Sequence, residues 1–292
     1  MCELDQLNEM DAKAGSVSRR QFGKVGAVAG LGAAFAPWAT ACAQGAGGLT
    51  ENMVSFEAPG GTMDAFFVHP AEGKHPAVII WPDIAGLRDA FKAMARRLAT
   101  AGYSVLVANP FYQDGPAPQF KDFEDFRGNN GFQKVGPWMA KNTHEAVTGA
   151  AQAAVAWLDK QAAVDTAKGI GTQGYCMGGP FVVRTTAAVP ARVKGGATFH
   201  GGGLVSDDPN APVKLLPKAQ ASYLIAIAKN DDAQRPTEKD VIKEAMAAAG
   251  RPAEIEVYQG DHGWTVADSP VYNEAEAERA WTRLLALYGR AL

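Results

Sequence analysis

A cysteine flanked by glycines is the feature of this 292-residue chain whose chemistry is most clearly defined. Cys176 lies in Gly174-Tyr175-Cys176-Met177-Gly178-Gly179, between a predicted strand and a predicted helix. The spacing fits G-x-S-x-G with cysteine in place of serine, the pattern of a nucleophile on a sharp strand-to-helix turn. The glycines leave room where strand and helix approach, and the start of the helix favours the thiolate. The alternative is a buried structural cysteine beside packing glycines.

A nucleophile on such a turn requires an acid and then a histidine later in the chain. His262 follows a predicted strand over 254–258 and precedes the last predicted helix. Asp231 and Asp232 follow the predicted strand over 222–228. We favour Asp231 as the carboxylate that orients His262 and stabilises its charged form, and Asp232 is the alternative.

The transition state of acyl transfer also needs hydrogen-bond donors for the developing oxyanion. The loop after the predicted strand over 76–81 begins with Pro82, Asp83 and Ile84. We expect the Ile84 N–H to be one donor and the Met177 N–H, directly after the cysteine, to be the other. A glycine-rich segment that begins at His200 follows the strand after the cysteine, too late in the chain for this role. We therefore predict a structural turn there.

The elements that must position these residues alternate between strand and helix along the chain. Such alternation indicates βαβ units and a mostly parallel central sheet flanked by helices. A turn at 59–61 would join the first two strands. The predicted strands cover 53–57, 63–69, 76–81, 103–108, 169–175, 193–199, 222–228 and 254–258, and the predicted helices cover 87–101, 138–163, 177–188, 236–249 and 273–291.

Residues 109–137 show no clear period and contain many aromatic side chains. A long aromatic loop in a compact domain is usually a lid or a binding loop. We therefore predict that this segment covers an apolar substrate, with core packing of its aromatic residues as the alternative.

The N-terminal segment is typical of an export signal. Ser18-Arg19-Arg20-Gln21-Phe22-Gly23-Lys24 resembles a twin-arginine signal at every position, and a mild apolar run over 25–41 follows it. Ala41-Cys42-Ala43 provides a cleavage site before Gln44, and lipid attachment at Cys42 is the lesser alternative. We therefore predict an export signal over 1–43, a short linker over 44–50 and one domain over 44–292. The twin-arginine machinery would be its partner and the periplasm its location.

Composition excludes several functional classes. Hydrophobic residues make up 47% of the chain and charged residues 20%, which is typical of a globular protein. The formal net charge of −3 lacks the basic excess of a nucleic-acid binder, and the apolar run is too short and weak for stable membrane insertion. Zinc and dinucleotide motifs are missing, so we predict no metal and no organic cofactor. Oligomeric state is not indicated by the sequence.

At the residues named above, the chain resembles the dienelactone hydrolase family, which has the α/β-hydrolase fold. The segment around Cys176 looks like the family's G-Y-C-x-G-G turn, and Asp231 and His262 match its triad acid and base. In that family a Glu at the position of Asp83 contacts the resting thiol. The side chain of Asp83 is one methylene shorter than that Glu. Tyr112, in a segment similar to P-D-L-Y, and Trp264, after the histidine, are the candidate substrate-binding residues.

The resemblance implies a hydrolase of small-molecule esters or lactones. Cys176 would attack the carbonyl and form an acyl thioester, which water then releases. A thioesterase or a hydrolase of small amides or peptides with the same triad is one alternative. A non-catalytic binding protein on the same fold is another.

Overall fold

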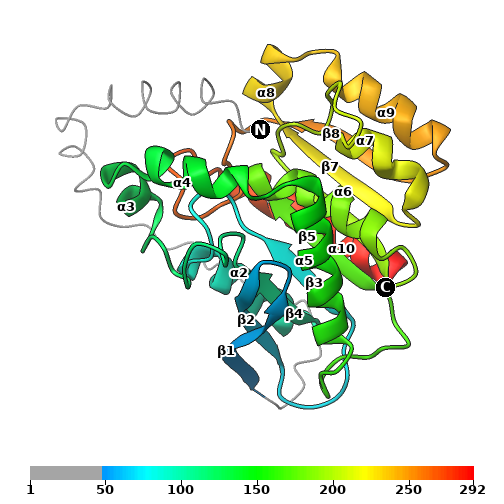
Figure 1. The fold of residues 1–292 in the computed structure, drawn as a ribbon. Helices are drawn as coiled ribbons and strands as arrows, with labels where there is room; N and C mark the ends of the chain where they lie inside the picture. Colours follow the sequence, from blue (N-terminus) through cyan, green and yellow to red (C-terminus); the bar gives the residue numbers. More distant parts are fainter. Residues whose placement is uncertain (1–47) are drawn as a thin grey trace, which may run out of the picture.

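The computed structural model describes residues 48–292, so the predicted export signal, its cleavage site and most of the predicted linker lie outside the described residues. Within the described part, eight strands form one sheet in the order β1-β2-β4-β3-β5-β6-β7-β8 (Figure 1). β1 pairs with β2 and β2 with β4 in antiparallel fashion, and every other pairing is parallel. The strands are β1 (Leu49–Ala58), β2 (Gly61–Pro70), β3 (Ala77–Trp81), β4 (Ser104–Ala108), β5 (Ile170–Tyr175), β6 (Val193–Phe199), β7 (Ser222–Ala228) and β8 (Ala253–Tyr258).

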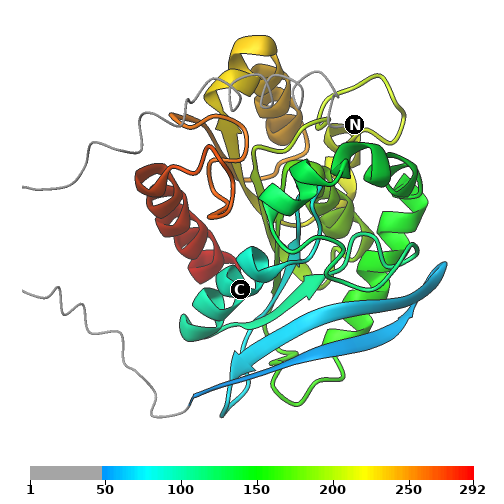
Figure 2. The same cartoon turned by 90° about the vertical axis from the view of Figure 1, so that its left-hand side faces the viewer.

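Helices cover both faces of the sheet. α2 (Asp89–Thr100) and α10 (Glu274–Ala291) pack on one face, and α5 (His144–Leu158) and α6 (Gly179–Ala188) pack on the other (Figure 2). This arrangement confirms the predicted mostly parallel sheet flanked by helices. The remaining elements are α3 (Phe123–Gly128), α4 (Gly131–Ala140), the 3₁₀ turn η1 (Cys176–Gly178), α7 (Pro212–Leu215), the 3₁₀ turn η2 (Leu216–Lys218), α8 (Lys229–Gln234) and α9 (Glu238–Ala248).

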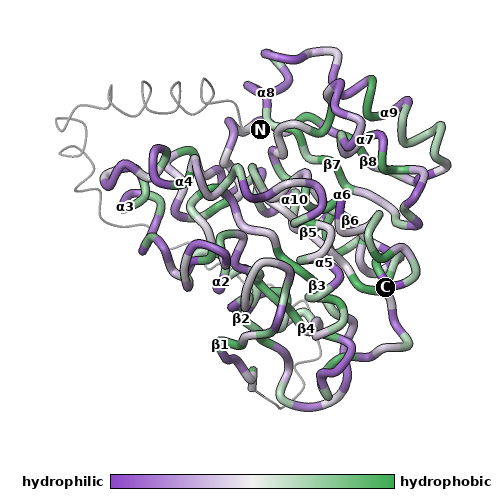
Figure 3. Tube along the Cα trace, in the orientation of Figure 1, coloured by the Kyte–Doolittle hydropathy of each residue, from purple (hydrophilic) through white to green (hydrophobic). Residues whose placement is uncertain are grey.

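The central strands are buried because helices cover them on both sides. Every residue of β3, β4 and β5 is buried, as expected for strands in the interior of a parallel sheet. Figure 3 shows hydrophobic residues along β3 and β4 and hydrophilic residues on the outer turns. Within the described residues, no helix is both long and apolar enough to span a bilayer.

Two sequence predictions were wrong in the middle of the chain. The predicted helix over 138–163 is interrupted: α4 ends at Ala140, and α5 starts only after Thr143, whose side chain accepts a hydrogen bond from Ala146 N. The segment 109–137 is not a loop throughout, because it contains α3 and most of α4. Asp122 caps α3 by accepting from Asp125 N. The apolar residues of α3 and α4 do not repeat with one continuous helical period, so the sequence pattern did not reveal either short helix.

Candidate active site

The turn between β5 and α6 holds Cys176 in a strained backbone conformation. Its φ is +51°, a left-handed value that non-glycine residues adopt at a cost of about 1–3 kcal/mol. The glycines on either side are required by close approach. A Cβ on Gly174 would lie 2.0 Å from the carbonyl oxygen of Gly178, and one on Gly178 would lie 2.3 Å from the Trp81 oxygen. The backbone therefore leaves no room for a side chain at position 174 or position 178.

Asp231 and His262 come together at the carboxyl ends of two neighbouring strands. β7 and β8 are parallel and adjacent, and each of the two residues follows one of them. His262 Nδ1 lies 2.8 Å from Asp231 Oδ2, and both side chains are buried. Because a carboxylate accepts, Nδ1 carries the proton and Nε2 is left as the basic nitrogen. Asn230 Oδ1 also accepts from His262 N at 2.8 Å.

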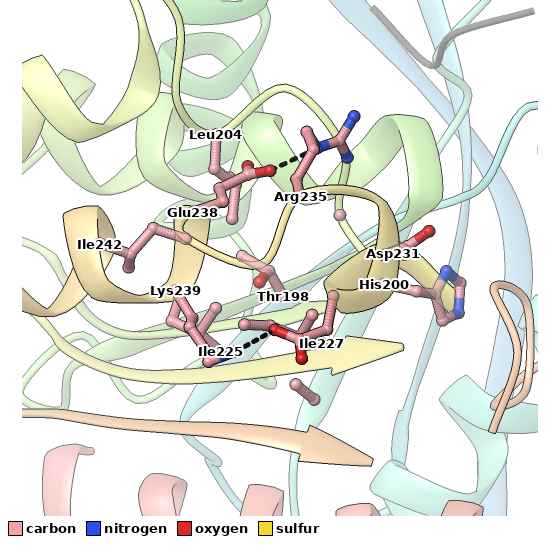
Figure 4. A pocket seen from close by; sticks show the side chains of 13 residues that line it. Thr198, His200, Leu204, Ile225, Ile227, Asp231, Arg235, Glu238, Lys239 and Ile242 are labelled. Atoms are coloured by element: carbon pink, nitrogen blue, oxygen red, sulfur yellow. Dashed lines mark hydrogen bonds and ion pairs between the residues drawn. The ribbon is translucent and has the colours of Figure 1, made fainter. Parts of the chain in front are cut away.

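Asp232 has a different partner. Its carboxylate lies 2.6 Å from Lys239 Nζ in α9. Figure 4 shows Asp231 beside His200 at one end of a small pocket, away from Ile242. The structure thus brings Asp231, the favoured residue of the two, to the histidine.

The His200 ring lies between Tyr175 of the cysteine turn and His262. Its ring centroid lies 4.9 Å from that of His262 and 6.2 Å from that of Tyr175, the residue before Cys176. His200 is buried, and its Nε2 lies 2.9 Å from Thr265 Oγ1. Burial lowers the pKa of His200 well below its ordinary value, and the charge of His262 lowers it further. His200 is therefore neutral near pH 7 and lies against His262 as an uncharged ring.

A buried ion cluster fixes the loop that carries Ile84. Arg88 is fully buried, and its guanidinium reaches Asp83 at 2.7 and 2.9 Å and Asp268 at 2.7 and 2.8 Å. Asp268 Oδ2 also accepts from Phe123 N, at the start of α3. Burial alone would lower the pKa of Arg88, but the charges and hydrogen bonds of the two aspartates raise it above its ordinary value. The cluster thus joins the loop after β3, the loop after His262 and the first residue of α3.

A pocket of about 1100 Å³ opens beside the cysteine turn. Ile84 and Met177, the two predicted oxyanion donors, are among the residues that line it. The pocket continues between α4 and α6, where Phe132, Met139 and Phe181 contribute apolar walls. The space is large enough for a small organic molecule.

Comparisons with known proteins identify the family of this chain. Residues 63–292 match the Dienelactone hydrolase family. The chain belongs to the dienelactone hydrolase family. It is 28% identical to a putative carboxymethylenebutenolidase of Methylorubrum extorquens over 92% of this chain and 91% of that one. It is 24% identical to one of Salmonella typhi over 84% of this chain and 88% of that one.

A solved structure shows the same fold. The crystal structure of a putative dienelactone hydrolase from Klebsiella pneumoniae superimposes with a TM-score of 0.68 and 22% identity, over 83% of this chain and 99% of that one. The predicted α/β-hydrolase fold is therefore confirmed, and the family assigns a hydrolase.

Three residues chosen by resemblance to dienelactone hydrolases have other contacts. Both carboxylate oxygens of Asp83 bind Arg88, so Asp83 holds the loop that carries Ile84, and its contact with the thiol stays a prediction. Tyr112 donates its hydroxyl hydrogen bond to Pro59 O, and Trp264 is buried and stacked on Tyr258 with a centroid distance of 4.7 Å. Neither aromatic residue lines the large pocket. Packing against neighbouring turns and strands therefore explains both side chains.

Sequence reasoning missed Arg88, Asp268 and the role of His200 as a neighbour of His262. Arg88 and Asp268 are 180 positions apart, and no local pattern pairs them. The one available signal was an arginine between two apolar stretches, at the start of a predicted helix.

Replacing Arg88 tests the ion cluster. Arg88→Met leaves the Asp83 and Asp268 carboxylates without their counter-ion, so we expect the free energy of unfolding to fall by about 3–5 kcal/mol in urea denaturation. Arg96→Met is the matched control, because Arg96 forms an exposed ion pair with Glu51 and should cost about 1 kcal/mol or less. Equal losses in the two variants would show that the buried cluster contributes no more to the free energy of unfolding than the exposed ion pair does.

The lowered pKa of His200 predicts a pH-dependent stability. The unfolded chain takes up this proton near the ordinary value of 6.5, and the folded protein does so only at lower pH. Folding stability should therefore fall as the pH drops below that value, by up to about 1.4 kcal/mol per pH unit. Denaturation at about pH 7.5 and about pH 5.5 should show this loss in the wild type and less of it in His200→Gln. His75→Gln, outside the site, should behave as the wild type does, and an unchanged loss in His200→Gln would contradict the assignment.

Proposed function

We propose that this protein hydrolyses carboxylic esters or lactones through a Cys176–His262–Asp231 triad and an acyl-thioester intermediate. The observation that carries the proposal is the buried Asp231–His262 hydrogen bond of 2.8 Å at the sheet edge that also bears the strained Cys176. Membership of the dienelactone hydrolase family supports the same chemistry.

The proposed reaction has two halves. In the first, the Cys176 sulfur bonds to the carbonyl carbon, and the carbonyl oxygen takes the negative charge. His262 holds the thiol proton and passes it to the departing alkoxide as the carbon–oxygen bond breaks. In the second half, His262 takes a proton from water, and the hydroxide bonds to the thioester carbon. The carbon–sulfur bond then breaks, His262 returns the proton to the sulfur, and the acyl group leaves as a carboxylic acid. Asp231 stabilises the charged imidazole in both halves.

Backbone N–H groups would hold the oxyanion. Ile84 and Met177 both line the pocket beside the turn, which supports their N–H groups as the donor pair. A fixed pair of donors stabilises the charge that develops on the oxygen, and each is worth about 3 kcal/mol. The Arg88 cluster would keep the Ile84 loop in position, since Asp83 and Arg88 flank Ile84 in the chain.

Hydrolysis of 4-nitrophenyl acetate by the domain over 44–292 tests the triad. Cys176→Ala should abolish turnover, and Asp231→Asn should lower kcat by about 10²- to 10⁴-fold because His262 loses its orienting charge. Asp232→Asn is the matched control, since its carboxylate binds Lys239 and not the histidine. Circular dichroism would establish that each variant is folded. Full activity in folded Cys176→Ala, or a larger loss in Asp232→Asn than in Asp231→Asn, would contradict the assignment.

We also propose export through the twin-arginine route to the periplasm. The support is the S-R-R-x-F-x-K pattern over 18–24 and the A-x-A site before Gln44. Fractionation of bacteria that produce the full chain should find a periplasmic protein that begins at Gln44 by mass spectrometry. The double variant Arg19→Lys, Arg20→Lys should stay unprocessed in the cytoplasm. Export unaffected by the double variant would refute this route, and a lipid on Cys42 would refute cleavage before Gln44.

A further inference from the structure

His262 has to reach across the sheet to take part in the proposed reaction. It follows β8 and Cys176 follows β5, and β7 and β6 lie between these two strands in the sheet. Neighbouring strands lie about 4.8 Å apart, so these two strand ends are about 14 Å apart. The segment that carries His262 must therefore extend over the end of β6. His200 is the residue that directly follows β6.

The backbone of His200 is strained and fixed in place. Its φ is +42°, a left-handed value that glycine adopts without strain, and three glycines follow it at 201–203. His200 N donates to Ala226 O in β7 at 2.8 Å. A Cβ on Gly179, at the start of α6, would lie 2.5 Å from the Cα of Gly201. The end of β6 is thus packed closely against both β7 and α6.

A side chain at this position must compensate for the strain of its backbone. Glycine adopts such a φ at lower cost, as Gly203 does at +69°. Strained residues persist where their surroundings over-determine them, and they gather at functional sites. The strain therefore indicates that the contacts of the His200 ring are needed.

Three side chains hold the His200 ring against His262. Thr265 Oγ1, three residues after His262, lies 2.9 Å from His200 Nε2. The ring centroids of Tyr175 and Trp264 lie 6.2 and 6.3 Å from that of His200. The His262 centroid is nearer, at 4.9 Å, and its ring is tilted by 58°. Because both histidines are buried, the two imidazoles pack against each other away from solvent.

We propose that His200 is a positioning residue for His262. Its ring supports the His262 imidazole from the end of β6 and keeps Nδ1 directed at Asp231 while Nε2 gains and loses a proton. This inference rests on the proposed triad, because His262 must keep one orientation through both halves of the reaction. In this role His200 acts through His262 and transfers no proton itself.

The supporting ring has to be uncharged. His262 becomes positively charged in each half of the reaction, and a second charged imidazole with its centroid 4.9 Å away would oppose this. Burial lowers the pKa of His200 well below its ordinary value, and the charge of His262 lowers it further. His200 is therefore neutral when His262 is charged. A phenylalanine ring is uncharged as well and has a similar shape, so it should substitute for the support.

Two substitutions separate the ring from the strain of the backbone. His200→Gly removes the ring and relieves the strained φ, and His200→Phe keeps an uncharged ring. With 4-nitrophenyl acetate, His200→Gly should lower kcat about 10- to 100-fold and change KM by about twofold or less, because the orientation of His262 is lost. His200→Phe should keep kcat within about threefold of the wild type. Tyr103→Ala is the control and should leave kcat unchanged, because it removes a ring beside Tyr288 at the amino end of β4.

An NMR measurement tests the orientation of His262 without any turnover. With ¹⁵N-labelled histidine, the proton on His262 Nδ1 should give a low-field signal, because it is hydrogen-bonded to Asp231, and His262→Gln should lack this signal. The signal should persist in His200→Phe and disappear through exchange with water in His200→Gly.

The two experiments distinguish the positioning role from the proposed function. If the wild type hydrolyses no ester but the signal responds in the expected way, the proposed function fails and the positioning role stands. An unchanged signal in His200→Gly, or a signal lost equally in His200→Phe, would overturn the positioning role. An unchanged kcat in His200→Gly of an active enzyme would overturn it as well.

Discussion

The buried guanidinium of Arg88 is the constraint on which the geometry of the site depends. A charge that is removed from water this completely requires compensation in contact with it, and two aspartates supply it from loops 180 positions apart. One loop carries Ile84, the proposed oxyanion donor, and the other follows His262. Because the same Asp268 oxygen accepts from Phe123 N, the start of the α3 segment is fixed as well. The side chain of Arg88 and its two aspartates thus fix the positions of three loops that share no strand pairing with one another.

Close backbone packing is the second constraint, and it acts on Cys176. The left-handed conformation of the cysteine persists because β5 and α6 meet at glycines, and because β5 lies in the interior of the sheet between β3 and β6. The parallel order of β5, β6, β7 and β8 then places the ends of four successive strands along one edge. Cys176, His200, Asp231 and His262 follow those four strands in turn, so sheet topology alone gathers them.

This dependence explains which parts the sequence could predict. β6 and β7 occur with the predicted bounds. In β7, a continuous apolar run from Tyr223 to Ala228 identifies a buried strand. The glycine spacing around Cys176 and the positions of Asp231 and His262 after their strands are local signals of the same kind. The break at Thr143 was missed because a single cap divides two segments of similar composition. The pairing of Arg88 with Asp268 is a tertiary contact and leaves no trace in either local sequence, and the other contacts of Asp83, Tyr112 and Trp264 follow from packing in the same way.

Arg88 and Arg184 are both desolvated arginines, but their surroundings differ. Burial opposes the charge of each. Arg88 has two carboxylates in contact with it, and they neutralise its charge inside the fold. Arg184 has none at ion-pair distance and faces a pocket that begins at Met177. His200 lies against His262 and is neutral near pH 7, so it adds no positive charge that would oppose the protonation of His262.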